Sequence, residues 1–295
     1  MKYRRTITIL VVFIALAAGI AAGVGVFSSG GPGRFDYESL RGRTVPIYGE
    51  GVYRHMSADV AVQGIGQDVV TLFIGIPALI VALVLARRGG LRARLLLGGV
   101  LGYFFVQYLF YLVMGMYNPL FLVYTALAGT GFFALALVLL GVDLARLHTA
   151  LAERAPVRFA GGFLVVNAVA IGLMWLQVVV PPLLEGSVYP EQLQHYTTLI
   201  VQGLDLELLL PLSAVTGVLL MRRTTMGVLL GPVYLVFLSF QMTALVGKLV
   251  AMGLTGVSIV PAIFIIPVIG LVSIGSAVGV FRRIDDPGAG GEGAG

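Results

Sequence analysis

Residues 63–94 read QGIGQDVVTLFIGIPALIVALVLARRGGLRAR, and this stretch decides the fold class. Its centre, residues 69–86, carries no charged side chain. A helix of about 20 residues rises about 30 Å, which matches the hydrocarbon core of a bilayer. One end of the stretch carries Asp68 between amide and apolar residues, and the other end carries several arginines. The stretch therefore predicts a transmembrane helix with a defined direction.

The composition of the whole chain points to the same solvent. The 295 residues are 58% hydrophobic and 11% charged, and the mean hydropathy is +0.99. Soluble domains carry about 25% charged residues. This chain has too much apolar surface for one water-excluded core, so the composition predicts an integral membrane protein with the lipid bilayer as its main partner.

Several classes of site are excluded or disfavoured by the residues that are missing. The chain has no cysteine, which excludes disulfides, thiolate zinc sites, iron–sulfur ligation and a thiol nucleophile. Its three histidines are too few for a histidine-rich metal or haem site. The phosphate-loop, dinucleotide, zinc-protease and serine-hydrolase motifs are also absent. We therefore expect no cofactor, no metal and no catalytic residues. The net charge of +5 does not predict nucleic-acid binding, because the basic residues stand in short groups at the ends of apolar runs.

The apolar runs predict an all-α, polytopic transmembrane helical bundle of about eight spans. The spans cover about residues 6–27, 60–86, 95–116, 120–142, 159–180, 204–221, 226–252 and 257–281. Residues 1–27 are an N-terminal membrane anchor or a signal peptide. Residues 28–58 form an extracytoplasmic loop, residues 59–284 a seven-span bundle, and residues 285–295 a disordered Gly-rich cytoplasmic tail. The fifth span is expected to stop at Pro181-Pro182.

The basic residues set the orientation, because cytoplasmic loops are enriched in Lys and Arg. With both termini in the cytoplasm, the outer side holds Arg34, Arg41, Arg43, Arg54 and Lys248, and the remaining 14 of the 19 basic residues lie inside. We therefore predict a multi-pass protein of the cytoplasmic (inner or plasma) membrane.

Residues 45–140 carry a recognisable pattern. It comprises YGEGVYR at 48–54, QDVVTL at 67–72 with Pro77, and YNPLFLVY at 117–124. The pattern resembles a family of uncharacterised prokaryotic multi-span membrane proteins. That family has no assigned activity, so the resemblance implies membrane spans and no site residues.

Polar residues recur every four positions at the start of the second span. These are His55, Asp59, Gln63, Gln67 and Thr71. Residues four apart share one face of a helix. The line therefore predicts one wall of an outward-facing polar cavity, with an interfacial first helical turn as the alternative.

A second set consists of charged residues predicted to lie in the outer halves of the spans. It comprises Asp68, Asp205, Glu207 and Lys248. Charged side chains within a membrane face the bundle, pair with one another or reach water. We expect these four to line the cavity, with His55, Asp59 and Gln67 as outer lining. The alternative is a snorkelling lysine beside interfacial acids.

Three functions stay open from the sequence. The first is binding or transport of a small solute or ion through the outward-facing cavity. The second is a structural or accessory subunit with a membrane-complex partner. The third is a membrane-embedded enzyme acting on lipid or exported substrates, which would bring His55 or His195 within hydrogen-bond reach of a carboxylate.

Overall fold

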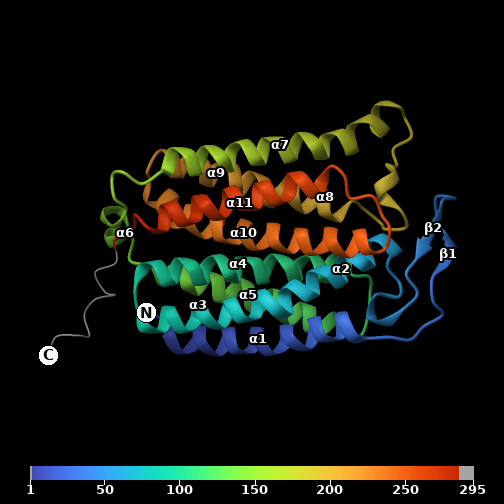
Figure 1. The fold of residues 1–295 in the computed structure, drawn as a ribbon, viewed down its shortest axis with the longest axis horizontal. Coiled ribbons are helices and arrows are strands. Elements are labelled where there is room, and N and C mark those ends of the chain that lie inside the picture. Colours follow the sequence, from blue (N-terminus) through green and yellow to red (C-terminus); the bar gives the residue numbers. More distant parts are fainter. Residues whose placement is uncertain (1, 286–295) are drawn as a thin grey trace.

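The computed structural model describes residues 2–285, and helices dominate it (Figure 1). Within this range, eight helical segments are long and apolar enough to cross a membrane. The first four are α1 (Arg4–Phe27), the composite of α2 (Ala58–Val70), η2 (Thr71–Gly75) and α3 (Ile76–Arg88), then α4 (Leu91–Met114) and α5 (Phe121–Leu140). The other four are α7 (Val157–Leu184), the composite of α8 (Ile200–Leu204), η4 (Asp205–Leu209) and α9 (Leu210–Met221), then α10 (Thr225–Leu254) and α11 (Ala262–Phe281).

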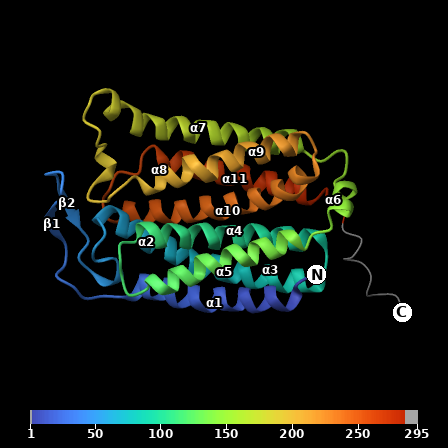
Figure 2. The ribbon, with the colours of Figure 1, turned by 180° about the vertical axis from the view of Figure 1, so that it is seen from behind.

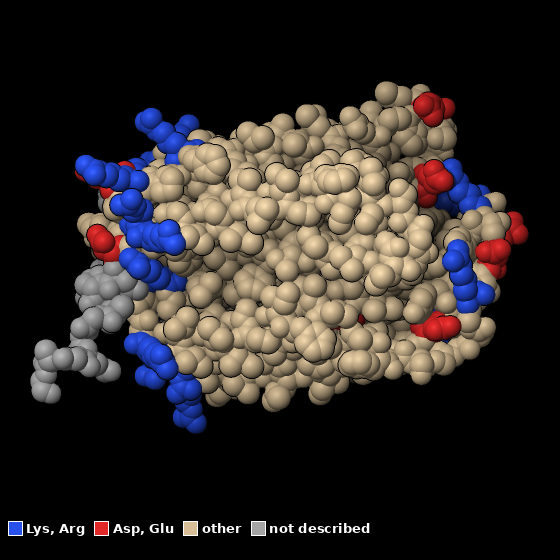
Figure 3. Space-filling model, in the orientation of Figure 1, with Lys and Arg blue, Asp and Glu red and all other residues tan. Residues whose placement is uncertain are grey.

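The spans lie side by side, and their two ends differ in charge. The space-filling view shows Lys and Arg gathered at one end, here called the basic end, with an uncharged band in the middle (Figure 3). The start of α1 and the end of α11 both lie at the basic end (Figure 1). The opposite end, here called the hairpin end, carries strands β1 (Phe35–Glu38) and β2 (Thr44–Ile47). A lipid solvent requires this arrangement, because helices satisfy their own backbone polar groups and the charged side chains stay at the two rims.

The spans form two halves that pack in the same order. In the first half, α1 contacts α2 and α3, α3 contacts α4, and α5 closes the group against α4 and α1 (Figure 2). In the second half, α7 contacts α9, α9 contacts α10, and α11 closes the group against α10 and α7. Helix α10 joins the halves, because it also packs on α2 and α4. The core is centred on α4 and α10, whereas α7 exposes most of its surface.

Each half contains one π-helical turn followed by a proline. In the second span, the N–H of Ile76 bonds the carbonyl of Thr71, five residues back, and Pro77 follows. In the sixth span, the N–H of Leu210 bonds the carbonyl of Asp205, and Pro211 follows. Proline lacks an N–H and clashes with the carbonyl four residues earlier. The wider turn relieves that clash, and π-helical turns of this kind are frequent at functional sites.

Four boundaries differ from the sequence predictions by four residues or more, and the first is the start of the third span, which lies at Leu91 instead of about residue 95. Helix α7 continues through Pro181 and Pro182 to Leu184. Both prolines lie in its last turn, where their carbonyls accept bonds from the N–H groups of Glu185 and Val188. The sixth span begins at Ile200, four residues earlier than expected, and the eighth begins at Ala262, five residues later. The predicted tail, 285–295, lies outside the described residues apart from Asp285.

The predicted loop 28–58 is ordered as an antiparallel hairpin with a short turn. Strands β1 and β2 pair with Phe35 opposite Ile47 and Glu38 opposite Thr44. The 3₁₀ turn η1 (Gly51–Tyr53) follows and is held by the N–H of Val52, which donates to the hydroxyl of Ser28 at 2.9 Å. This arrangement directs Tyr53 into the bundle, where only 2% of it is exposed.

Candidate functional site

Asp68 is the most enclosed acidic side chain of the predicted site. Only 1% of it is exposed, although it lies in α2 near the hairpin end. The hydroxyl of Tyr53 donates to its Oδ2 atom at 2.5 Å, and the hydroxyl of Tyr111 donates to its Oδ1 atom at 3.0 Å. Gly25 of α1 closes the remaining side, since a Cβ there would stand 1.8 Å from Oδ2. The carboxyl group is therefore enclosed by the loop at the hairpin end, by α1 and by α4.

The hydrogen bonds around Asp68 are compatible with both the ionised and the protonated form of its carboxyl group. Tyr111 has a single O–H group, yet it lies 3.0 Å from Asp68 and 2.9 Å from the carbonyl oxygen of Gly64. It can donate fully to only one of the two. If Asp68 takes up a proton on Oδ1, it donates to Tyr111 and Tyr111 donates to Gly64. Both the ionised and the protonated carboxyl thus have good partners.

Tyr53 remains a donor to this carboxyl group at neutral pH. Burial raises the pKa of its hydroxyl well above the ordinary value of 10, and Tyr111 and Asp68 raise that pKa further. A hydroxyl that keeps its proton cannot compete with the carboxylate for one. Tyr53 therefore fixes the position of Asp68 from outside the helical spans.

A cluster of tyrosines surrounds the carboxyl group. The ring of Tyr111 stacks on that of Tyr53, with centroids 6.2 Å apart, and on that of Tyr124, with centroids 5.4 Å apart. Tyr108 stacks on Tyr124 at 6.1 Å. The hydroxyl oxygen of Tyr124 is buried without a hydrogen-bond partner among the described residues. The stacked rings thus form an apolar shell around the carboxyl group, with hydroxyl groups inside it.

A second polar network lies about one helical turn from Asp68, toward the basic end, with no hydrogen bond to Asp68 among the described residues. The hydroxyl of Thr71, one turn further along, lies 2.9 Å from Gln107 Oε1 and 3.0 Å from the hydroxyl of Tyr103. The amide nitrogen of Gln107 also lies 2.7 Å from the Thr71 hydroxyl. Thr71, Tyr103 and Gln107 are all buried. Two spans thus share hydrogen-bonding groups inside the first half of the bundle.

Asp205 lies in the second half and has a different partner. The indole N–H of Trp175 in α7 donates to its Oδ2 atom at 2.8 Å. Asp205 begins the π-helical turn η4 and is partly buried. Trp175 is the only tryptophan in the chain. Its fluorescence is therefore a natural reporter for this carboxyl group.

Lys248 is the basic residue on which both aspartates act. It lies on α10, the helix that joins the halves, and both Asp205 and Asp68 act on it electrostatically. Within the described residues, no direct ion pair joins it to either carboxylate. Next to it, Gly247 meets Gly66 of α2 so closely that a Cβ on Gly66 would stand 2.6 Å from the Gly247 carbonyl oxygen. This crossing brings α10 against the helix that carries Asp68.

The other predicted residues do not join this group. Glu207 is exposed and makes no hydrogen bond or ion pair within the described residues. Asp59 is partly exposed in the first turn of α2, and Gln67 is 5% exposed beside Asp68. His55 is exposed and accepts a hydrogen bond from Arg54 Nε at 3.2 Å. Of the predicted residues, Asp68 and Asp205 are thus the two acids that influence Lys248 electrostatically, and these three residues are here called the charge cluster.

The histidines do not form an acid–base pair with a carboxylate. The Nε2–H of His195 donates to the backbone carbonyl of His55 at 3.0 Å. Burial lowers the pKa of His195, although the bond to His55 partly offsets this effect. Among the described residues, neither histidine lies within hydrogen-bond reach of a carboxylate. Nor does any group of three or more His, Asp or Glu side chains in this range form a metal site.

Sequence reasoning missed Tyr53 and Trp175 as partners of the two aspartates. Tyr53 belongs to a loop whose path no helical periodicity predicts. Tyr111 carried a usable signal, because Gln107 and Tyr111 stand four residues apart and share one face of α4 with Tyr108 nearby.

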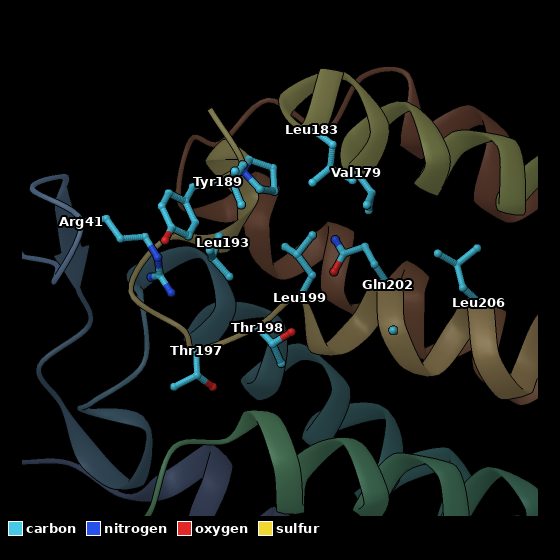
Figure 4. A pocket seen from close by; sticks show the side chains of 13 residues that line it. Arg41, Val179, Leu183, Tyr189, Leu193, Thr197, Thr198, Leu199, Gln202 and Leu206 are labelled. Carbon is cyan, nitrogen blue, oxygen red and sulfur yellow. The ribbon is translucent and has the colours of Figure 1, made fainter. Parts of the chain in front are cut away.

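A pocket opens at the hairpin end, above the second half of the bundle (Figure 4). It encloses about 360 Å³ between the end of α7, the segment 188–199 and α8. Arg41 reaches it from the hairpin, and Gln202 and Leu206 reach it from the sixth span (Figure 4). None of the predicted site residues lines this pocket. Asp205 follows Gln202 by three residues, so the pocket lies about one helical turn from the charge cluster.

No family model, curated protein or solved structure matches the chain. The resemblance of residues 45–140 therefore gains no family assignment.

Proposed function

We propose that this membrane protein moves a small solute or an ion across the membrane. The ion is a proton, and the charge cluster is the site that binds it. The observation that carries the proposal is the position of Lys248. It comes from the helix that joins the halves and interacts with Asp68 of one half and Asp205 of the other. Ionisable residues inside a membrane protein commonly mark ion pathways.

The mechanism follows from charge pairing. With both carboxylates ionised, one lysine is attracted to two competing partners. A proton on Asp68 leaves Asp205 as the only anion for Lys248, and a proton on Asp205 reverses the preference. Because the partners belong to different halves, protonation changes which half attracts α10. Two states of similar energy biased by a ligand are the basis of alternating conformations.

The remaining polar groups supply a route for the proton. Tyr53 and Tyr111 hold the carboxyl group of Asp68 in both protonation states. The separate network of Thr71, Gln107 and Tyr103 lies about one helical turn nearer the basic end. Hydroxyl and amide groups can pass a proton along hydrogen bonds, whereas the apolar shell keeps lipid away. The second and sixth spans contain the π-helical turns that allow local adjustment.

The test uses purified protein in liposomes that contain the pH dye pyranine. A potassium gradient with valinomycin makes the interior negative and draws protons inward. We expect wild-type protein to acidify the interior at least tenfold faster than protein-free liposomes. Asp205→Asn and Lys248→Met should return the rate to that of protein-free liposomes. Glu207→Gln is the matched control, because it changes an exposed acid two residues from Asp205, and should keep the wild-type rate.

Folding of each variant is checked by circular dichroism and by elution as a single species in detergent. The proposal fails if wild-type liposomes acidify no faster than protein-free ones. It also fails if folded Asp205→Asn and Lys248→Met both keep the wild-type rate.

A further inference from the structure

The pocket at the hairpin end has apolar walls and a defined size. Val179 and Leu183 of α7 form one wall, and Leu199 and Leu206 form the opposite side (Figure 4). Its volume of about 360 Å³ corresponds to roughly 12 non-hydrogen atoms at the roughly 30 Å³ that a water molecule occupies in the liquid. Small-molecule sites are typically concave, mostly apolar and supplied with a few placed polar groups.

A fixed cation stands at one side of this pocket. Arg41, in the turn between β1 and β2, donates one hydrogen bond from Nη1 to the carbonyl of Tyr196 at 3.0 Å. Its guanidinium lies 5.1 Å from the ring centroid of Tyr189. A guanidinium has five N–H donors, and no carboxylate pairs with Arg41 among the described residues. Its charge is held in place and keeps donors for an anion.

An amide without a partner stands at the other side. Gln202 is 9% exposed, and its side chain points into the pocket between Leu199 and Val179 (Figure 4). Its amide makes no hydrogen bond within the described part of the chain. The donors and the acceptor of this amide are therefore free to bind a polar atom that a ligand brings into the pocket.

From these three observations we infer that the pocket binds a small organic anion of the bulk solution. The anion has about a dozen non-hydrogen atoms in all: a carboxylate that Arg41 binds, an apolar body, and a hydrogen-bonding group at its far end for Gln202. No acidic side chain lines the pocket, so a cationic ligand lacks a counter-ion there. This inference goes beyond proton movement, and its test measures binding without any flux.

The test is calorimetric titration of the full-length protein in phosphatidylcholine nanodiscs, with empty discs to subtract partitioning. The probe is 9-hydroxynonanoate, which has 12 non-hydrogen atoms. The uncharged comparison is nonane-1,9-diol, and the comparison without the far hydroxyl is nonanoate. We expect the hydroxy acid to bind at least tenfold more tightly than the diol and at least threefold more tightly than nonanoate.

Two variants separate the two polar contacts. Arg41→Gln should lose the preference for the acid over the diol and still bind the diol, which shows that the pocket remains formed. Gln202→Leu should lose the preference for the hydroxy acid over nonanoate. Arg34→Gln is the matched control, since Arg34 is an exposed arginine of the same loop that does not line the pocket, and it should bind like wild type.

The inference is overturned if wild-type protein binds the acid and the diol equally, or if Arg41→Gln weakens both equally. A lipid headgroup is the competing source of an amphipathic anion. The titration is therefore repeated in phosphatidylglycerol discs at high salt, where surface potentials are screened. Equal affinity in the two lipids supports a free acid, and a loss of tenfold or more would assign the site to lipid instead.

Discussion

Replacement of Gly25 by alanine tests the packing that encloses Asp68. A Cβ at this position would stand 1.8 Å from Asp68 Oδ2, 2.7 Å from its Cγ and 2.9 Å from the Tyr53 hydroxyl. Ordinary van der Waals contact begins at 3.4 Å, so the carboxyl oxygen must move by about 1.6 Å, the difference between these distances. A shift of that size breaks the 2.5 Å hydrogen bond to Tyr53.

The expected loss of stability follows from these contacts. A hydrogen bond to a charged group contributes about 1.5–3 kcal/mol, and overpacking a filled site costs about 1–3 kcal/mol. Alanine regains up to about 1 kcal/mol through its higher helix propensity. We therefore expect Gly25→Ala to lower the free energy of unfolding by about 2–5 kcal/mol. Gly23→Ala is the control on the same helix, because a Cβ there meets nothing within 4 Å.

The assay is unfolding in mixed micelles by increasing the fraction of sodium dodecyl sulfate, followed by far-ultraviolet circular dichroism. Asp68→Ala in the Gly25→Ala background supplies a double-mutant cycle. With the carboxyl group absent, Gly25→Ala should cost less than about 1 kcal/mol, since its main obstacle is gone. Equal costs of Gly25→Ala with and without Asp68, or equal stabilities of Gly25→Ala and Gly23→Ala, would refute this account of the packing.

Two further predictions concern other contacts. Gly161→Ala should lower the free energy of unfolding by about 2 kcal/mol or more, because its Cβ would stand 2.5 Å from the backbone carbonyl of Gly217. Gly162→Ala is the control and should be neutral, since a Cβ there meets nothing within 4 Å. Equal thermal midpoints of the two variants in detergent would contradict the close contact of α7 and α9. Tyr53→Phe should cost about 1.5–3 kcal/mol, since Asp68 loses a donor while the ring stays. Unchanged unfolding in mixed micelles would show that this hydrogen bond contributes nothing measurable.

The spans could be predicted because lipid imposes a simple rule. Every backbone polar group must be satisfied within the segment, so an apolar run of sufficient length becomes a helix. One error occurred at the end of the fifth span, where two prolines were read as a stop. Pro181 and Pro182 fall in the last turn, so only the carbonyls of Gln177 and Val178 lose their helical donors, and the proline carbonyls still accept bonds from Glu185 and Val188. Pro261, by contrast, immediately precedes α11, so that helix begins later than hydropathy alone indicates.

The grouping of Asp68, Asp205 and Lys248 could be predicted from the sequence, because charged side chains within a membrane face the interior of the helical bundle. The sequence could not show which of Asp205 and Glu207 belongs to the group. They stand two residues apart and so face about 200° apart on a regular helix, and both were expected inside. The contact of Tyr53 with Asp68 was also out of reach, because it depends on the path of a loop between α1 and α2. The functional role of these residues stays a prediction until flux is measured.

The two π-helical turns have a consequence for which way the aspartates face. One additional residue per turn advances a helix by about 100° relative to regular winding. Removing a single residue from Thr71–Gly75 would therefore swing the acid-bearing end of the second span by more than a quarter of a circle relative to its arginine-bearing end. The same arithmetic applies to Asp205–Leu209. Any periodicity calculation that assumes one continuous phase along these two spans misassigns the lipid-facing side of half of each.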